Sequence, residues 1–407
     1  MTSYKDAFES IRGSWDPAFA GVAEAFAMGI ANGQERGGQV AVFLHGEPVV
    51  DFLAGWNPPA GLNAGAGVAA GKVIDEPISE RTPYPDNAVQ LIFSQTKGLT
   101  GVAFADVVSR GLIDPEKKVT EYWPEFGAAG KENITVRQLV GHSAGMPGWA
   151  EVFDAAELFD WERVVGKLAE QAPRWEPGTA HGYHAITVGF LAGELIRRVT
   201  GLKPGEYLER YFRAPGNLSV WIGLPESERH RLAAHSWGPR TEGWGAALSA
   251  AQADPDSTTT FAYRSPAGLD EAMLDPRFMD VEIPSVNGFA DARSLASLYA
   301  SFTDGPLNRY DDAVVQAVSQ PVGEGNDEVL VGDVSRYGLV FQLGGIREPM
   351  ISSGSFGHNG RGGCVSFADP ASGIAFSYVE NQLSSEPLPQ SRVCRLVTAV
   401  RDGLAKC

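Results

Sequence analysis

The 407-residue sequence contains little cysteine, with only Cys364, Cys394 and Cys407. Their odd number and wide spacing argue against a disulfide framework and indicate a reducing compartment. No Cys/His spacing resembles a zinc site. We therefore expect no structural metal and no other cofactor.

Long apolar runs and positive charge are also scarce. No stretch approaches 18 consecutive apolar residues, so we expect no transmembrane helix. The first residues show no basic segment followed by an apolar core, which predicts a cytoplasmic protein without a secretory signal. Lys and Arg number 33 against 50 Asp and Glu, a net charge of −17. Such a surface repels nucleic acid and anionic membranes, and we expect neither as a partner. The oligomeric state stays open.

The rest of the composition, 43% hydrophobic and 20% charged, is that of an ordinary globular protein. Hydrophobic periodicity predicts strands near both ends and helices in the middle. The predicted strands are 39–44, 49–54, 337–344, 363–368 and 373–379, and the predicted helices are 4–32, 94–110, 136–140, 155–171, 186–199, 204–213, 291–302 and 393–404. Residues 57–88 read as irregular loop. Residues 224–284 carry no firm element, and so long a segment is often a functional wall or lid.

This arrangement predicts an α+β fold. Strands from both chain ends most simply share one antiparallel sheet, flanked by the terminal helices. The sheet domain would then be discontinuous, with residues 1–90 and 286–407, and residues 91–285 would form an inserted, mostly helical domain. An active-site cleft is expected between the two.

The segment Ser94 to Lys97 carries the first chemical signal. Of the nine lysines, only this one has a serine three positions earlier. On a helix, that spacing places a hydroxyl and an amine on one face, as an activated nucleophile requires. An apolar, strand-like run (89–93) precedes it and a long helix follows, so Ser94 is expected at a helix N-terminus, which favours developing negative charge. The alternative is a serine N-cap followed by a surface lysine.

A second serine competes for the role of nucleophile. Residues 141–145 match Gly-x-Ser-x-Gly, the nucleophile elbow of α/β-hydrolases, with Ser143 at its centre and His358 as a partner late in the chain. An elbow requires a buried strand before the serine and a helix directly after it. Here a cap and helix-like spacing precede Ser143, and Pro147 follows, which cannot propagate a helix. A structural loop is therefore the favoured interpretation.

Five segments together carry a resemblance to a known family. Ser94–Lys97 matches a Ser-x-x-Lys box, and 111–126 resembles the segment after that box. Ile134–Gly145 resembles a Thr-x-x-x-Leu-Leu-x-His-x-Ser-Gly loop. Trp175–Tyr183 resembles the approach to a second box, and Phe356–Pro370 resembles a third box and its strand. In this order the sequence resembles the class C-like branch of the serine β-lactamase and penicillin-binding-protein superfamily, and most of all its family VIII carboxylesterases. The resemblance also explains Gly-x-Ser-x-Gly as part of a family loop.

The resemblance implies the catalytic roles. Ser94 would attack the ester carbonyl and form an acyl-enzyme, with Lys97 and Tyr183 as its base. Which of these two accepts the serine proton stays open. The oxyanion hole would consist of the backbone N–H groups of Ser94 and Arg361.

Four other residues are candidates for the substrate pocket. His358 and Gly360 of the third box would line it, although a structural, hydrogen-bonding histidine is nearly as good an interpretation of His358. Trp149 and Phe153 could form aromatic walls, and ordinary core packing is the alternative for both.

Two departures from the lactamase pattern bear on the substrate. The second box, usually Tyr-x-Asn, is Tyr183-His184-Ala185 here, and the third box, usually Lys-Thr-Gly, is His358-Asn359-Gly360. The missing side chains help to hold a carboxylated β-lactam in lactamases, so their loss favours a small or short-chain carboxylic ester. β-Lactamase, D-amino-peptidase and acyltransferase activities are the alternatives on the same scaffold. A non-catalytic binding protein is a further one.

Overall fold

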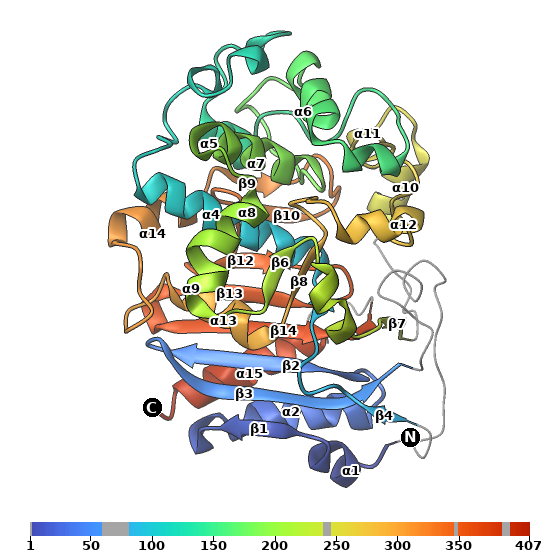
Figure 1. The fold of residues 1–407 in the computed structure, drawn as a ribbon, viewed down its shortest axis with the longest axis vertical. Coiled ribbons are helices and arrows are strands. Elements are labelled where there is room, and N and C mark those ends of the chain that lie inside the picture. The colour runs from blue at the N-terminus through green and yellow to red at the C-terminus, as the bar shows by residue number, and fades with distance from the viewer. Residues whose placement is uncertain (1, 59–80, 239–245, 346–348, 385–390) are drawn as a thin grey trace.

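The computed structural model describes residues 2–58, 81–238, 246–345, 349–384 and 391–407 (Figure 1). The helices are α1 Tyr4–Glu9, α2 Ala20–Ala31, α4 Thr96–Ser109, α5 Val136–Val140, α6 Trp161–Glu170, α7 Thr187–Thr200, α8 Pro204–Leu208, α9 Ala214–Gly216, α10 Ala246–Ala253, α11 Thr258–Tyr263, α12 Leu269–Ala272, α13 Ala292–Ala300, α14 Asp312–Ser319 and α15 Arg392–Leu404. The strands are β1 Arg12–Trp15, β2 Gly37–Leu44, β3 Glu47–Asn57, β4 Thr82–Pro83, β5 Gln90–Leu91, β6 Val220–Ile222, β7 Ser236–Trp237, β8 Gly288–Ala290, β9 Gly323–Asn326, β10 Val334–Tyr337, β11 Gln342–Leu343, β12 Phe356–Asn359, β13 Val365–Asp369, β14 Ile374–Glu380 and β15 Gln382–Leu383.

One antiparallel sheet joins the two ends of the chain, as the sequence predicts. Its strand order is β1-β3-β2-β14-β13-β12-β11-β10-β9, with β4 added to β3. The junction is the pairing of β2 with β14, in which Val40 lies opposite Tyr378 and Val42 opposite Phe376. The predicted α+β class is therefore confirmed.

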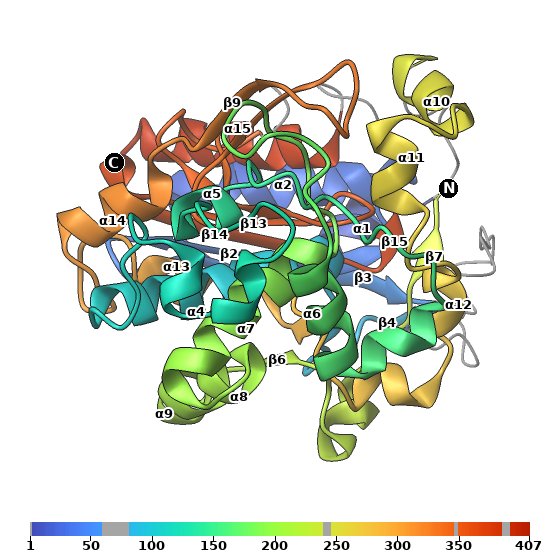
Figure 2. The same cartoon turned by 90° about the horizontal axis from the view of Figure 1, so that it is seen from above.

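The two faces of this sheet belong to two hydrophobic cores. Because side chains alternate along a strand, Val40 and Val42 point to one core, while Ala41 and Phe43 point to the other. The first core is closed by α2 and α15, and the second by α13 and α4, as the view from above shows (Figure 2). The second core continues into the helices drawn above the sheet in Figure 1.

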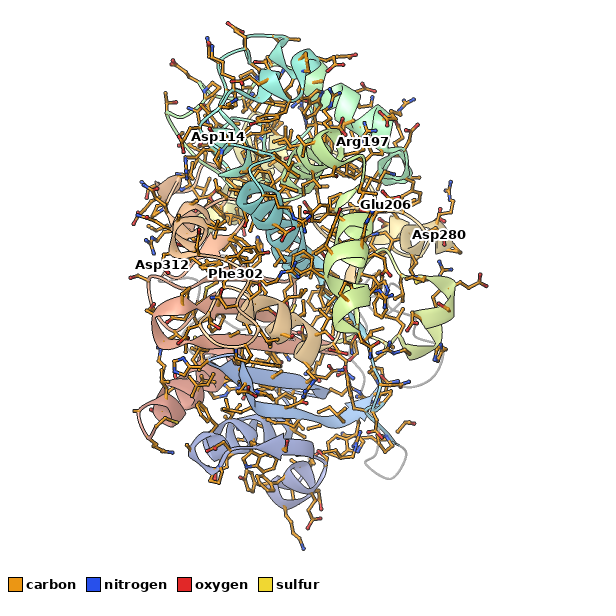
Figure 3. All side chains as sticks on the ribbon, turned by 60° about the vertical axis from the view of Figure 1, so that its left-hand side comes forward. Asp114, Arg197, Glu206, Asp280, Phe302 and Asp312 are labelled. Carbon is orange, nitrogen blue, oxygen red and sulfur yellow. The ribbon has the colours of Figure 1, made fainter. Side chains whose placement is uncertain are left out.

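Figure 3 illustrates how the apolar and acidic side chains are distributed. Phe302 lies inside the second core against the rings of Phe341 and Phe356, at centroid distances of 5.8 and 5.1 Å. Asp114 and Asp312 lie at the periphery, in keeping with the large excess of acidic residues. None of the helices in the described part of the chain combines the length and hydropathy that a bilayer span requires.

Two predicted elements are wrong. The helix expected over 4–32 is interrupted by β1, which pairs with β3. At Gly13, in that strand, φ is +137°, and a Cβ would collide with the backbone of Asp51 and Phe52. The strand expected over 337–344 is broken into β10 and β11, because Val340 adopts a φ of +69° between them. In both places the backbone geometry, rather than the side-chain pattern, decides the outcome.

Other predicted boundaries shift by less. The helix expected over 155–171 is divided at Asp160 into a 3₁₀ helix and α6, and 204–213 continues from α8 into a π-helical turn. The described residues of the weakly patterned segment 224–284 form short elements, among them α11 and α12, and residues 239–245 lie outside the described residues. Of the predicted irregular loop 57–88, residues 59–80 lie outside the described residues.

Candidate active site

Ser94 lies where the chain passes from the short strand β5 into α4, a 14-residue helix of the second core. It belongs to a 3₁₀ helix, Phe93–Gln95, between β5 and α4. The preceding residue, Phe93, has a φ of +46°, which is an uncommon conformation for a bulky side chain and often marks a functional site. The predicted helix start is confirmed. The N-cap alternative is wrong, because Gln95 holds the cap position of α4 and makes no side-chain cap bond.

The side chains of Ser94, Lys97 and Tyr183 lie together, as the sequence predicts. Lys97 Nζ lies 3.1 Å from Ser94 Oγ, and the Tyr183 hydroxyl lies 3.0 Å from the same oxygen. Lys97 Nζ also lies 5.1 Å from the centroid of the Tyr183 ring. Ser94 and Tyr183 are partly exposed, whereas Lys97 is fully buried. A solvent-accessible hydroxyl is thus held between an amine and a phenol.

Burial makes Lys97 an unusual lysine. Desolvation lowers the pKa of its amine well below the ordinary value of 10.5. Besides Ser94 Oγ, the amine donates to the carbonyl of Ser285 at 3.0 Å. Ser285 is itself fixed, since its hydroxyl donates to Ile186 O at 2.7 Å and accepts from Gly189 N at 2.9 Å. The sequence analysis missed Ser285, which lies 188 residues from Lys97 and carries no motif.

The histidines beside Tyr183 have structural partners. His184 Nε2 accepts from Met146 N at 3.0 Å, and its Nδ1 lies 2.6 Å from Gly182 O. This arrangement fits a neutral ring, and burial lowers the pKa of His184 to about 4. His181 Nε2 lies 3.1 Å from the Ser335 hydroxyl. The third position of the box, which carries the amide in lactamases, is Ala185, whose methyl side chain cannot form a hydrogen bond.

His358 lies in β12 and faces the same region. Its ring centroid is 6.0 Å from that of Tyr183, and its Nδ1 lies 2.7 Å from Asn359 O. Nε2 is buried and has no hydrogen-bond partner among the described residues. Burial and the nearby Lys97 hold the pKa of His358 well below its ordinary value. The side chain is therefore a neutral group near the site.

The loop after β12 packs against the Ser94 turn. A Cβ at Gly360 would lie 2.7 Å from Ile92 O, so only glycine fits there. In the described residues, no protein acceptor is found for the backbone N–H of Ser94 or of Arg361. The Arg361 guanidinium forms a two-point ion pair with Asp270 of α12, at 2.5 and 3.0 Å. The loop therefore adjoins both the serine and part of the 224–284 segment.

Ser143 does not have the geometry of a nucleophile elbow. It follows a helix, α5, which begins with a capping box formed by Thr135 and Gln138. The Ser143 hydroxyl donates to the carbonyl of Gln138 at 3.3 Å. Gly145, with a φ of +73°, then continues an irregular loop. The elbow interpretation is thus excluded by its local structure.

Trp149 and Phe153 lie in the second core. Trp149 is fully buried, its Nε1 donates to Val164 O at 3.1 Å, and its ring contacts those of Phe153 and Phe190 at 5.3 and 6.0 Å. Core packing accounts for both side chains. Their contribution to a substrate pocket stays a prediction.

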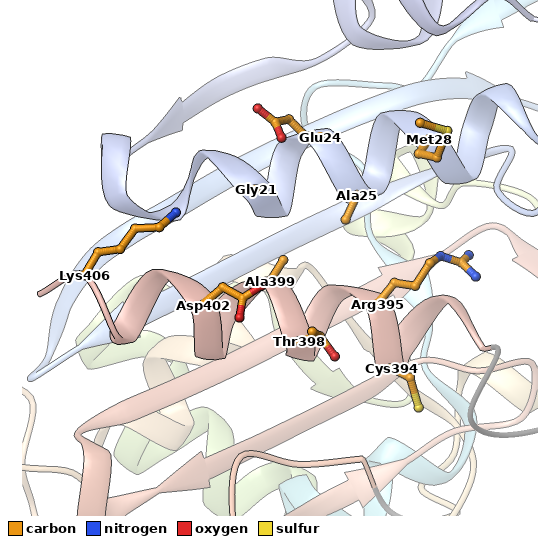
Figure 4. A pocket seen from close by; sticks show the side chains of 10 residues that line it. All are labelled: Gly21, Glu24, Ala25, Met28, Cys394, Arg395, Thr398, Ala399, Asp402 and Lys406. Carbon is orange, nitrogen blue, oxygen red and sulfur yellow. The ribbon is translucent and has the colours of Figure 1, made fainter.

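A groove of about 580 Å³ lies elsewhere, between α2 and α15 (Figure 4). Its lining mixes small, charged and sulfur-containing residues, such as Ala25, Glu24 and Cys394. These two helices cover the opposite face of the sheet from α13, so the groove is separate from the Ser94 site (Figure 2). No cluster of metal-binding side chains is found in the ranges that the structure describes.

A sheet built from both chain ends, beside a helical region that carries Ser-x-x-Lys and a tyrosine, defines a hydrolase with the β-lactamase fold. A family model described as Beta-lactamase matches residues 22–393, and the chain belongs to this family. The resemblance inferred from the motifs is thereby confirmed.

Individual relatives place the chain more closely. It is 31% identical to the Esterase/beta-lactamase LipL of Mycobacterium tuberculosis, over 93% of this chain and 85% of that protein. A penicillin-binding protein homolog from Caulobacter crescentus is 32% identical, with a TM-score of 0.80 over 97% of this chain and 99% of that one. The crystal structure of a family VIII carboxylesterase is 30% identical, with the same TM-score and coverage. The chain is therefore an enzyme, a hydrolase of the esterase/β-lactamase type.

Proposed function

We propose that this protein hydrolyses small or short-chain carboxylic esters through an acyl-enzyme on Ser94. One observation carries the proposal: Ser94 Oγ lies within hydrogen-bond distance of both Lys97 Nζ and the Tyr183 hydroxyl, at 3.1 and 3.0 Å. A serine hydroxyl is a weak nucleophile until a neighbouring base accepts its proton.

Lys97 and Tyr183 together supply that base. Burial lowers the pKa of Lys97 well below its ordinary value, which favours the neutral amine that a base requires. The Ser94 proton passes to the Lys97–Tyr183 pair as Oγ bonds to the ester carbonyl carbon. The carbonyl π electrons move onto its oxygen and form a tetrahedral intermediate. When this collapses, the ester C–O bond breaks, and the pair returns a proton to the departing alkoxide.

The N–H groups of Ser94 and Arg361 form the proposed oxyanion hole. Their lack of a protein acceptor in the described residues supports this role, because unpaired donors are free for a developing negative charge. Water then attacks the acyl-enzyme, and its proton follows the same route through Lys97 and Tyr183. The acid leaves, and Ser94 regains its proton.

The side chains of the second and third boxes favour an ester over a β-lactam. Ala185 stands where lactamases carry the amide, and both ring nitrogens of the neighbouring His184 are engaged with the backbone, so neither side chain offers a hydrogen bond to the substrate. His358 is neutral where lactamases carry a lysine, so the pocket lacks that positive charge for a carboxylate. The similarity to a family VIII carboxylesterase supports this assignment, and the relative named Esterase/beta-lactamase is compatible with either activity. β-Lactamase, D-amino-peptidase and acyltransferase activities are the alternatives.

The proposal also includes the position of the site between two domains and the cellular location of the protein. Ser94, Lys97 and Tyr183 come from the segment 91–285, and Arg361 comes from the segment 286–407, which supports a cleft between the two proposed domains. The three cysteines are free thiols, in keeping with a cytoplasmic protein.

The substrate class is tested by comparing kcat/KM for p-nitrophenyl acetate, longer acyl esters and a chromogenic cephalosporin. We expect the short esters to be preferred, with each activity lost in Ser94→Ala. A higher kcat/KM for the cephalosporin would overturn the ester assignment. Product analysis with added alcohol distinguishes acyl transfer from hydrolysis.

A further inference from the structure

Tyr183 belongs to no helix or strand, so other contacts must fix its hydroxyl over Ser94. It lies in the connection between α6 and α7, and the helix begins only at Thr187. A misplacement of about 1 Å in such a group can cost about 100-fold in rate. The precision of the site therefore depends on what holds this connection.

The β9–β10 loop holds it through one carboxylate, Asp327. This side chain is 4% exposed, and its Oδ1 accepts from Tyr183 N at 3.1 Å. The same oxygen accepts from Val329 N at 2.9 Å and Leu330 N at 2.8 Å, which folds the loop around the carboxylate. A further bond, from Glu328 N to His181 O at 3.0 Å, joins the two segments. Asp327 thus ties the Tyr183 backbone to the edge of the sheet.

The second oxygen of Asp327 fixes an aromatic neighbour of Tyr183. Oδ2 accepts from the Ser335 hydroxyl at 2.6 Å and from the Tyr337 hydroxyl at 3.1 Å. The Tyr337 ring lies nearly parallel to the Tyr183 ring, with an interplanar angle of 12° and a centroid distance of 6.2 Å. His142 lies against both rings, at 4.1 Å from Tyr337 and 5.8 Å from Tyr183. One carboxylate therefore orders both the backbone and the ring environment of the tyrosine.

We propose that Asp327 is the positioning residue that sets the Tyr183 hydroxyl against Ser94 Oγ. It touches neither the substrate nor the reacting atoms and acts only through Tyr183. This inference rests on the proposed role of Tyr183 in ester hydrolysis. None of the motifs in the sequence includes Asp327, which is 144 residues from Tyr183.

The test measures kcat and KM for p-nitrophenyl acetate, with active sites counted by fluorophosphonate titration. We expect Asp327→Ala to lower kcat about 10- to 100-fold while KM changes less than about threefold. Asp327→Asn should stay within about fivefold of the wild type, because an amide oxygen still accepts the three N–H bonds and hydroxyls can accept from its NH₂. Equal losses in the two variants would overturn positioning by hydrogen bonds.

A double-mutant cycle separates positioning from general damage. In a Tyr183→Phe background, Asp327→Ala should lower kcat by less than about threefold, because the hydroxyl that it positions is already absent. The same factor in both backgrounds would overturn the proposal. Should Asp327→Ala not fold, Asp327→Ser, which retains one short acceptor, enters the same cycle with the same expectation.

Asp369 provides a matched control. It is 1% exposed and accepts from the hydroxyls of Ser352, Ser355 and Ser372 at 2.5, 2.6 and 2.7 Å, at the far end of β13 from the Arg361 loop. Asp369→Ala should lower Tm without changing kcat per active site. If it lowers kcat as much as Asp327→Ala does, the effect at Asp327 is not positional. If Tyr183→Phe leaves kcat unchanged, the proposed function fails, whereas an inactive Tyr183→Phe with a fully active Asp327→Ala refutes the positioning role alone.

Discussion

Among the described residues, two lysines, Lys97 and Lys131, are fully buried, and the groups that their amines contact differ. Each amine lies 5.1 Å from the centroid of an aromatic ring, Tyr183 or Phe126. Lys131 donates to three backbone carbonyls, those of Ala128, Ala169 and Gln171, whereas Lys97 donates to one carbonyl and to the Ser94 hydroxyl.

Burial lowers the pKa of Lys131 to about 8, and that of Lys97 well below its ordinary value. Three carbonyl acceptors match the three donors of an ammonium group, so Lys131 is suited to join backbone segments. The Lys97 amine instead contacts the Ser94 hydroxyl and one carbonyl. Burial alone therefore does not make a lysine catalytic; the group it faces decides.

The largest expected effect separates the two lysines by activity. Lys97→Met should lower kcat for an ester about 10³- to 10⁴-fold, because it removes a member of the proposed base pair. Lys131→Met should leave kcat per active site unchanged. Steady-state kinetics on titrated enzyme measures both, and similar losses in the two variants would break the comparison.

Tyr183→Phe tests the second member of the base pair. It keeps the ring over Lys97 and removes only the hydroxyl, so we expect kcat to fall about 10²- to 10³-fold, within the range of general acid–base catalysis. Circular dichroism should show an unchanged fold. A kcat close to that of the wild type would contradict the proposed Lys97–Tyr183 base and with it the proposed function.

Lys131→Met should instead destabilise the protein. It leaves three carbonyls without their donor, at a cost of about 2–3 kcal/mol in the free energy of unfolding. Urea unfolding followed by fluorescence measures the change. A stability equal to that of the wild type would show that Lys131 does not join these segments.

The pH dependence of stability sharpens the contrast. Between the folded and unfolded pKa of a buried lysine, only the unfolded state holds the proton, so stability rises with pH by about 1 kcal/mol per unit. Relative to Lys97→Met, the wild type should gain stability from the lowered pKa of Lys97 up to the ordinary lysine pKa of 10.5. Relative to Lys131→Met, the gain should begin only near pH 8. Urea unfolding at several pH values checks both, and identical profiles would refute the difference in pKa.

The smallest effect is expected for Ser143→Ala. The Ser143 hydroxyl makes one long bond, to Gln138 O at 3.3 Å. Its loss should cost less than about 1 kcal/mol and leave ester turnover intact. A large fall in kcat would reopen the elbow interpretation.

Local patterns predicted much of the scaffold. The hairpin of β2 and β3, the helices α4, α5 and α15, and the Thr135 cap are set by short-range periodicity and capping, which a sequence displays directly. The strand β1 could not be predicted in this way, because it is formed by pairing with β3 some 40 residues later and not by its own alternation.

The residues of the site likewise differ in whether a local sequence pattern predicts their contacts. Ser94 and Lys97 are one helical turn apart, so their contact follows from spacing alone. Ser285 and Asp327 lie in loops that meet Lys97 and Tyr183 only after the chain has folded, across 188 and 144 residues. A serine carbonyl and a loop carboxylate have no local signature that marks such a partner.

The central claim is that Ser94, and not Ser143, is the nucleophile. A fluorophosphonate applied to the folded enzyme, followed by proteolysis and mass spectrometry, tests it directly. The account predicts one phosphonylated peptide, which contains Ser94. It also predicts that Ser94 is labelled more slowly in Lys97→Met than in the wild type. A phosphonylated Ser143 in the wild type would contradict the account.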